Sequence, residues 1–164
     1  MIQLIFIRHG ATAGNLEKRY IGSTDEPLCD IGIAQVEALR KHNFQADYLY
    51  VSPMLRTRQT AELLFPQMRY TLVSDFRETN FGLFEGKTAA ELSSSMEYQA
   101  WVGSMCLDPI PQGESVTDFK ARCCSVFEEI MPISARLIAN KSAYKFKTTE
   151  IDEITKKVKG FIND

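Results

Sequence analysis

Three short runs of apolar and aromatic residues stand out in an otherwise mixed chain. They cover residues 4–7, 48–51 and 70–74. The first run contains no polar residue, which is typical of a strand buried on both faces of a parallel sheet. The pattern therefore predicts three strands, and the first of them ends at Arg8.

Between and after these runs, apolar residues recur at helical spacing. This spacing predicts helices over residues 30–40, 54–65, about 88–96 and about 115–131. Asp30 is the N-cap candidate of the first helix, and Ser115 with Asp118 resembles a capping box for the last. Pro66 and Pro132 are expected to end two of the helices, because proline has no N–H to donate inside a helix.

Strands that alternate with helices of this length predict an α/β sandwich with a mainly parallel sheet. The length of 164 residues predicts a single domain over residues 1–164. The segment 133–164 differs in character, because it is rich in lysine and its nearest strand candidates, residues 137–139 and 144–147, are poor. We therefore expect the α/β pattern to hold to about residue 130.

Composition and charge narrow the function classes. The chain carries 19 basic and 21 acidic residues, a net charge of −2, so no overall positive field attracts nucleic acid or an anionic membrane. An anion must then be bound by a local cluster. No apolar stretch approaches the roughly 18 residues of a membrane span, and no leader precedes the first apolar run. The four cysteines form no Cys-x-x-Cys pair and are expected to be reduced thiols. These features predict a soluble cytoplasmic protein and do not indicate an oligomeric state.

Charged residues follow each of the three predicted strands. Arg8 and His9 follow the first, residues 52–58 the second, and Arg77 with Glu78 the third. Ligands of open α/β sheets bind beyond the carboxyl ends of the strands. The planar fork of arginine suits bidentate contact with phosphoryl oxygens. The spacing therefore predicts a phosphate site, and leaves open whether bound phosphate reacts there.

Four ordered sequence blocks, spread over residues 2 to about 130, carry a family resemblance. The first is Arg8-His9-Gly10-Ala11-Thr12 with Asn15, followed by residues 22–28 and Gly32. The second is Ser52-Pro53 with Arg56, Gln59, Thr60 and Ala61. The third is residues 77–82 with Glu85-Gly86, and the fourth is residues 111–115 with Phe119 and Arg122. In these blocks the chain resembles the histidine phosphatase superfamily, which implies a three-layer, phosphoglycerate mutase-like α/β sandwich.

The resemblance also implies a role for individual residues. His9 would attack phosphorus and form a phosphohistidine, and Arg8, Arg56 and Asn15 would hold the phosphoryl oxygens. Glu78 would protonate the leaving oxygen and then act as the base for water. The implied substrate is a small phosphorylated metabolite, with phosphate or sulfate able to occupy the site. Neither a metal nor a cofactor is implied, because arginines neutralise the charge.

The chain departs from the family pattern in its last segment. The family carries a second catalytic histidine on a strand after the long helix, whereas this sequence has only His9 and His42. Three explanations stay open. The segment 133–164 has recruited another cation, for which Arg136, Lys141 and Lys145 are candidates; or a frameshift or truncation has replaced the family's ending; or the protein binds phosphoesters without turning them over.

Two functional hypotheses follow from the sequence. The first is a phosphatase of small phosphorylated metabolites, active or impaired, and the second is a non-catalytic phosphoester-binding protein. A phosphoglycerate mutase is the less favoured reading, because the chain size and early blocks resemble small phosphatases, among them those acting on α-ribazole phosphate. Single residues keep simpler interpretations. In these interpretations Asn15 would cap a turn, Glu78 would pair with Arg77, and His42 would end a surface helix. Three further side chains would line a substrate pocket or belong to a hydrophobic core: Tyr98, Trp101 and Met105.

Overall fold

The computed structural model describes the chain from residue 4 to residue 142, and its side chains as far as residue 131. The chain forms two compact units. One is Phe6–Phe119, and the other combines the residues before Phe6 with the chain from Lys120 onward. The prediction of a single domain over residues 1–164 stays a prediction.

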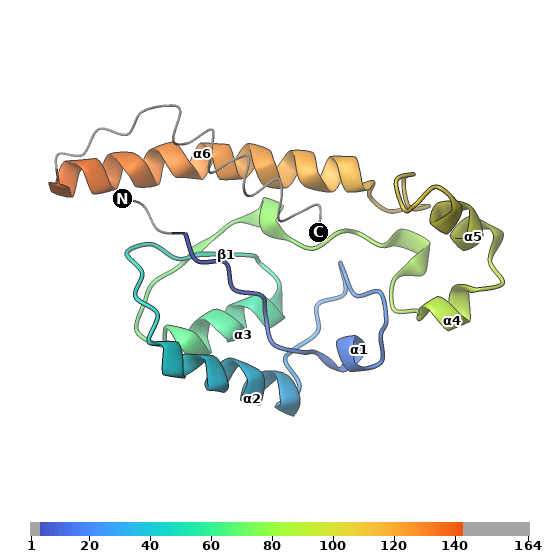
Figure 1. Ribbon diagram of the computed structural model, residues 1–164, viewed down its shortest axis with the longest axis horizontal. Coiled ribbons are helices and arrows are strands. Elements are labelled where there is room, and N and C mark those ends of the chain that lie inside the picture. The colour runs from blue at the N-terminus through green and yellow to red at the C-terminus, as the bar shows by residue number, and fades with distance from the viewer. Residues whose placement is uncertain (1–3, 143–164) are drawn as a thin grey trace. The chain divides into compact units, whose positions relative to one another are not determined.

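Helices dominate the described residues (Figure 1). In chain order the elements are α1 (Ala13–Leu16), α2 (Asp30–Leu39), η1 (Arg40–His42), β1 (Tyr50–Val51), α3 (Leu55–Leu64), β2 (Thr71–Leu72), η2 (Ser74–Phe76), η3 (Gly82–Phe84), α4 (Ala89–Leu92), α5 (Met96–Gly103) and α6 (Val116–Ser142), where η marks a 3₁₀ helix.

The sheet is a parallel pair of short strands joined through α3. Tyr50 lies opposite Thr71 in the register, and Val51 opposite Leu72. The pair is extended by hydrogen bonds from Thr71 N to Leu49 O (2.8 Å) and from Val73 N to Val51 O (2.9 Å). A helix between two parallel strands is the βαβ unit expected of an α/β protein. The predicted fold class is therefore confirmed, with both strands shorter than the apolar runs that predicted them.

The predicted strand over residues 4–7 is wrong. The structure assigns no strand there, and β1 with β2 is the only multi-residue ladder among residues 4–142. Leu4, Ile5 and Phe6 are 36%, 41% and 63% exposed. A continuous apolar run becomes a central strand only where neighbouring strands and two covering layers bury it. The described part of the chain does not bury these side chains.

The helices agree better with the sequence pattern. α3 lies within one residue of its predicted bounds at each end. α2 begins at Asp30, but its N-cap is Cys29, whose backbone is extended (φ −84°, ψ 170°). Asp30 instead occupies the first turn, where its negative charge favours the helix dipole.

The predicted helix over residues 88–96 is wrong in extent. The chain forms two shorter helices there, α4 and α5, separated by a serine-rich turn. Ser95 caps α5, since its side chain accepts the N–H of Tyr98 at 3.3 Å. Serine competes with the helical backbone for hydrogen bonds and so favours the start of a new helix over the continuation of an old one.

Helix α6 begins as predicted and ends later than predicted. Ser115 Oγ accepts the N–H of Asp118 at 3.0 Å and lies 2.7 Å from its carboxylate. The predicted end at Pro132 is wrong, because the helix continues to Ser142 and includes the strand candidate at residues 137–139. Interior proline costs a helix about 3 kcal/mol, which a helix of 27 residues can offset through its other turns.

The rest of the atypical segment, residues 143–164, lies outside the described residues, and so does the strand candidate at residues 144–147. Among the described helices, none has the length and apolarity needed to span a membrane.

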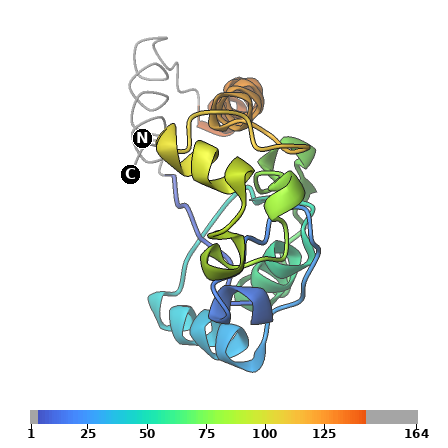
Figure 2. The same cartoon turned by 90° about the vertical axis from the view of Figure 1, so that its right-hand side faces the viewer.

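Two groups of elements build the unit Phe6–Phe119. α2 and α3 lie side by side (Figures 1 and 2). An aromatic core covers the region of α4 and α5, where buried Phe84, Leu92, Trp101 and Ile110 are surrounded by Tyr20, Phe81, Tyr98 and Cys106. The Phe84 and Tyr98 rings meet edge to face, with centroids 5.3 Å apart.

Candidate active site

The charged clusters predicted from the sequence meet at one cleft. The cleft measures about 140 Å³ and is lined by Ile7, Arg8, His9, Ser52, Met54, Arg56, Thr57, Phe76, Arg77, Glu78 and Phe119. Four of these residues follow β1 and three follow β2. They therefore lie beyond the carboxyl ends of the parallel strands, where α/β sheets bind their ligands.

His9 is half-buried in this cleft and has a defined tautomer. Its Nδ1 lies 2.7 Å from the carbonyl oxygen of Gly10. A carbonyl can only accept, so Nδ1 carries the proton and donates it. In the neutral ring, Nε2 is then left with its lone pair, which is the state required of a nucleophile.

Burial lowers the pKa of His9 below its ordinary value of 6.5. The hydrogen bond to Gly10 acts in the opposite direction, while the positive charges of Arg56 and Arg8 lower the pKa further and Glu78 raises it. The net direction is downward, since burial and the two guanidinium groups disfavour an imidazolium. His9 is consequently neutral at pH 7.

The backbone around His9 is held by side chains from α2 and α3. Gly10 N donates to Thr60 Oγ1 (3.3 Å), and the Thr60 hydroxyl donates to the carbonyl of Arg56 (2.8 Å). Ala11 N donates to Gln35 Oε1 (3.0 Å). Thr60 is only 5% exposed. The sequence blocks contain Thr60, but its residue type alone did not reveal that it supports the loop of His9.

Glycine is required where this loop meets α2. A Cβ atom on Gly10 would lie 2.3 Å from the carbonyl oxygen of Gly32, and one on Gly32 would lie 2.0 Å from the carbonyl oxygen of Ala11. No real Cβ tolerates such contacts. Gly10 and Gly32 therefore allow the backbones of the His9 loop and α2 to touch.

Arg56 is the most buried charge of the cleft, with 1% of its surface exposed. Its Nη1 donates to Thr24 O (2.9 Å) and its Nη2 to Gly22 O (3.0 Å). Both partners are neutral carbonyls, and within the described residues Arg56 makes no ion pair with a carboxylate. Buried charges are normally paired, and this guanidinium lines the cleft together with His9; its role in binding an anion stays a prediction.

The other charged residues that line the cleft are more exposed than Arg56. Arg8 and Arg77 are exposed, and Arg77 Nη1 pairs with Asp75 Oδ1 at 2.9 Å. Glu78 is half-buried, and its Oε1 accepts the N–H of Thr79 at 2.8 Å. The cleft thus combines three guanidinium groups, one imidazole and one carboxylate.

Asn15 does not line this cleft. It is the third residue of α1, where its Oδ1 accepts the N–H of Thr12 (3.1 Å) while its own N–H donates to Thr12 Oγ1 (3.3 Å). This capping box matches the simpler interpretation of Asn15 as a turn cap. Because Oδ1 is engaged, the side-chain NH₂ is the end that could meet a phosphoryl oxygen, and that role stays a prediction.

The remaining candidates are placed elsewhere. His42 is exposed at the end of η1 and stacks on Phe44, with ring centroids 5.6 Å apart. Trp101 is 8% exposed and packs with Tyr98 in the aromatic core. Met105 is 80% exposed. None of these side chains lines the cleft.

None of the four cysteines lines this cleft. The four cysteines are free thiols, as the sequence predicts, and all are half-buried.

Comparison with known proteins identifies the family. The model of the histidine phosphatase superfamily (branch 1) matches residues 4–136. The chain belongs to the histidine phosphatase superfamily. The match includes the His9 loop, both strands, and Arg56 and Glu78 of the cleft.

Relatives of several functions resemble this superfamily member. It is 32% identical to GpmB of Yersinia pestis, named as a probable phosphoglycerate mutase, over 82% of this chain and 66% of GpmB. The crystal structure of the α-ribazole phosphatase from Shigella flexneri matches with a TM-score of 0.68 and 26% identity, over 80% of this chain and 66% of that one. A phosphoserine phosphatase from Entamoeba histolytica, solved in complex with 3-phosphoglyceric acid, matches with a TM-score of 0.65 and 25% identity, over 74% and 63%. The chain spans just under two thirds of the length of these relatives.

Proposed function

We propose that this protein hydrolyses phosphomonoesters of small metabolites through a phosphohistidine at His9. The observation that carries the proposal is the buried guanidinium of Arg56, which has neutral carbonyl partners and no carboxylate partner among the described residues. It lies in the same cleft as His9, whose Nε2 is free of the proton. An anion site beside a neutral imidazole supports phosphoryl transfer.

The first step forms the phosphohistidine. His9 Nε2 attacks phosphorus, and the bond from phosphorus to the ester oxygen breaks as the N–P bond forms. The leaving oxygen takes the proton of the Glu78 carboxyl group, so the alcohol departs neutral. Arg8 and Arg56 stabilise the charge on the non-bridging oxygens, which positions the group and needs no metal.

The second step restores the enzyme. Water attacks phosphorus on the side that the alcohol has left, and the Glu78 carboxylate takes its proton. The N–P bond breaks with its electron pair returning to Nε2, and inorganic phosphate leaves. Because Glu78 ends protonated and His9 neutral, the cycle is closed.

The size of the cleft supports small substrates. At about 140 Å³, it is below the roughly 300–1,000 Å³ that encloses a drug-sized ligand. A phosphoryl group fits inside, whereas most of a larger leaving group would project from the mouth. The superfamily relatives that match this chain include an α-ribazole phosphatase and a phosphoserine phosphatase with bound 3-phosphoglyceric acid. We infer a phosphorylated metabolite of that size class as substrate.

The decisive experiment is trapping of the phosphoenzyme with a ³²P-labelled phosphomonoester, quenched in alkaline detergent so that an acid-labile phosphohistidine survives. The wild type should carry label that is stable to base and labile to acid, as a phosphohistidine is. His9→Gln should carry none, while His42→Gln, which changes the other histidine of the chain, should label as the wild type does. Hydrolysis of p-nitrophenyl phosphate in the presence of EDTA should follow the same order. Turnover that persists in His9→Gln would refute the assignment.

A second candidate function is phosphoester binding without turnover. It is favoured by one observation, that in the described part of the chain the cleft contains His9 and no second histidine, with His42 exposed elsewhere. Loss of one preorganised donor typically lowers the rate by ~10²–10³. Under this alternative, inorganic phosphate raises the melting temperature while no phosphohistidine forms. The side chains of Arg136 and Lys141, and all of Lys145, lie outside the described residues, so a replacement cation there stays a hypothesis.

A further inference from the structure

Glu85 does not line the cleft, but its carboxylate accepts three backbone N–H groups. Its Oε1 accepts the N–H of Gly22 (2.7 Å) and the N–H of Thr24 (2.9 Å). Its Oε2 accepts the N–H of Phe81 (3.2 Å). One carboxylate therefore ties the loop that contains Gly22 and Thr24 to the start of η3.

The same loop is held from its other side by Arg56. The carbonyl oxygen of Gly22 accepts from Nη2 at 3.0 Å, and the carbonyl oxygen of Thr24 accepts from Nη1 at 2.9 Å. Each of these two loop residues thus donates its N–H to Glu85 and accepts from Arg56. The backbone of Gly22 and Thr24 therefore links the Glu85 carboxylate to the buried Arg56 guanidinium through hydrogen bonds on both sides.

The charge of Glu85 suits this arrangement. Burial alone would raise the pKa of Glu85, but the N–H groups of Thr24, Gly22 and Phe81 outweigh it and lower the pKa. Glu85 is therefore ionised at neutral pH. An ionised acceptor forms stronger bonds with N–H groups than a neutral one, which keeps the two loop carbonyls directed at Arg56.

The loop also lies against the segment that follows Glu78. A Cβ on Gly22 would lie 1.7 Å from the carbonyl oxygen of Thr79, so the two backbones are in direct contact. Thr79 in turn donates its N–H to the Glu78 carboxylate (2.8 Å). A shift of the loop would therefore disturb both a guanidinium and a carboxylate of the cleft.

We propose that Glu85 is a positioning residue, which fixes the Arg56 guanidinium for phosphate by holding the Gly22–Thr24 backbone from the opposite side. This inference rests on the proposed phosphate site. Arginine has five N–H donors, and two of those of Arg56 are taken up by the loop carbonyls. The remaining donors meet a phosphoryl group in the correct geometry only while the loop keeps its place.

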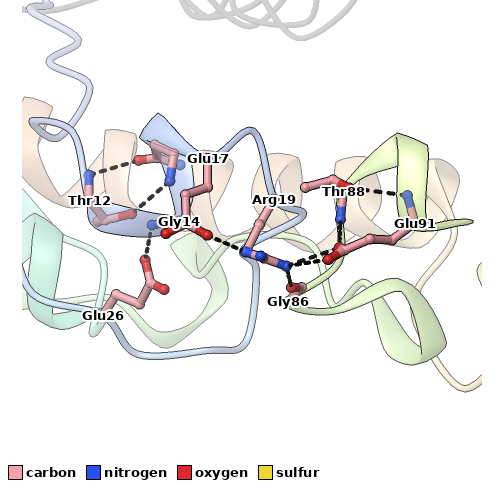
Figure 3. A network of polar contacts seen from close by, with 9 residues as sticks. Thr12, Gly14, Glu17, Arg19, Glu26, Gly86, Thr88 and Glu91 are labelled. Carbon is pink, nitrogen blue, oxygen red and sulfur yellow. Dashed lines mark hydrogen bonds and ion pairs between the residues drawn. The ribbon is translucent and has the colours of Figure 1, made fainter.

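The test compares Glu85→Gln with a matched control. Glutamine keeps the length and one carbonyl oxygen, but it removes the charge and turns an NH₂ toward the N–H of Phe81. Glu91→Gln is the control, because Glu91 also accepts a backbone N–H, that of Thr88 (2.7 Å), and pairs with an arginine, Arg19 (3.0 Å). Figure 3 shows that network, which joins α1 to α4 and does not include Arg56.

The readout is the dissociation constant of inorganic phosphate, measured by calorimetric titration in five proteins: wild type, the three single variants and the Arg56→Lys/Glu85→Gln double variant. Relative to wild type, Glu85→Gln should weaken binding about three- to tenfold, which lies in the lower part of the range expected for residues coupled through one hydrogen-bond network. Glu91→Gln should bind as the wild type does. In an Arg56→Lys background, where the fork that meets the loop is gone, Glu85→Gln should change the constant less than about twofold.

A merely structural role for Glu85 gives a different pattern. Two results would show that Glu85 does not act through Arg56. In the first, Glu85→Gln binds phosphate as tightly as the wild type does. In the second, Glu85→Gln weakens phosphate binding by the same factor in the Arg56→Lys background as in the wild type; either result overturns this inference and leaves the proposed function standing. If wild-type protein binds no phosphate, the proposed function fails and this inference fails with it. Amide hydrogen exchange gives an independent measurement: Glu85→Gln should speed exchange at Gly22 and Thr24, and unchanged rates there would also overturn the inference.

Discussion

The support of His9 by Thr60 gives the sharpest prediction about this cleft. Thr60→Val is nearly isosteric, so it creates no cavity, but it removes the oxygen that accepts the N–H of Gly10. Both Gly10 and Thr60 are buried. Water cannot readily replace the lost acceptor, and the peptide that adjoins His9 is expected to move in search of another partner.

The size of the effect follows from the contact. A buried donor left without a partner costs about 1–3 kcal/mol. The Gly10–Thr60 distance of 3.3 Å is longer than the usual 2.9–3.0 Å, so the lower part of that range, about 1–2 kcal/mol, is expected. For a protein of this size that lowers the melting temperature by about 2–8 °C. Displacement of a catalytic group by a fraction of an ångström to 1 Å should lower kcat/KM about tenfold to a hundredfold.

Thr60→Ser provides a control of similar stability. Serine keeps the acceptor for Gly10 but loses a buried methyl group, which costs about 0.8 kcal/mol. Urea denaturation should therefore show both variants to be destabilised, whereas hydrolysis of p-nitrophenyl phosphate should fall only in Thr60→Val. In NMR titrations, the pKa of His9 in Thr60→Val should move up toward 6.5 as the ring gains solvent. Equal kcat/KM values and equal His9 titrations in the two variants would refute the idea that Thr60 positions His9.

Three other predictions concern the same unit. The pKa of His9 is below 6.5 in the folded protein, so as the pH falls below 6.5 the imidazole is protonated in the unfolded chain before it is protonated in the folded one. The free energy of unfolding should therefore decrease as the pH falls in this range. Urea titrations from about pH 5 to about pH 8 should show a smaller dependence on pH in His9→Gln than in the wild type. Gly32→Ala should lower the melting temperature, since its Cβ would meet Ala11 O at 2.0 Å, whereas Gly103→Ala, with nothing within 4 Å, should raise it by the equivalent of up to about 1 kcal/mol. Saturating phosphate, at about 100 times its dissociation constant, should stabilise the wild type by about 2.7 kcal/mol and leave Arg56→Gln unchanged in thermal melts.

The sequence predicted helices well and strands poorly, for a physical reason. Helical spacing reports burial of one face of a single element, so α3 could be located to within one residue. A strand depends on partners that a local pattern does not contain. Residues 4–7 have the composition of a central strand, yet Phe6 is 63% exposed and the described ladder consists of β1 and β2. Pro132 failed as a helix end because its local penalty is small beside the cooperativity of a helix of 27 residues.

The candidate site was predictable to the extent that it depends on charged side chains. Arg8, His9, Arg56 and Glu78 follow strands or belong to family blocks, and all four line the cleft. Asn15 belongs to the same blocks but caps α1 outside the cleft lining. Residue type and spacing predict which side chain is present at a position. They do not predict which of its atoms will be hydrogen-bonded to a backbone N–H, as the amide oxygen of Asn15 is.

Two backbone contacts near the cleft, those of Thr60 and Glu85, were not predictable from the sequence. Thr60 and Glu85 both act on backbone N–H groups, which every non-proline residue has, so no pattern of side chains marks the partner. The tautomer of His9 is likewise set by the carbonyl of Gly10. The cleft thus contains two groups that favour different partners. One is a neutral imidazole with its lone pair on Nε2, and the other is a buried guanidinium without a carboxylate partner among the described residues. The guanidinium requires an anion, and the imidazole can accept only an electrophile. A phosphomonoester meets both demands with one group, because its oxygens carry the charge and its phosphorus accepts the lone pair.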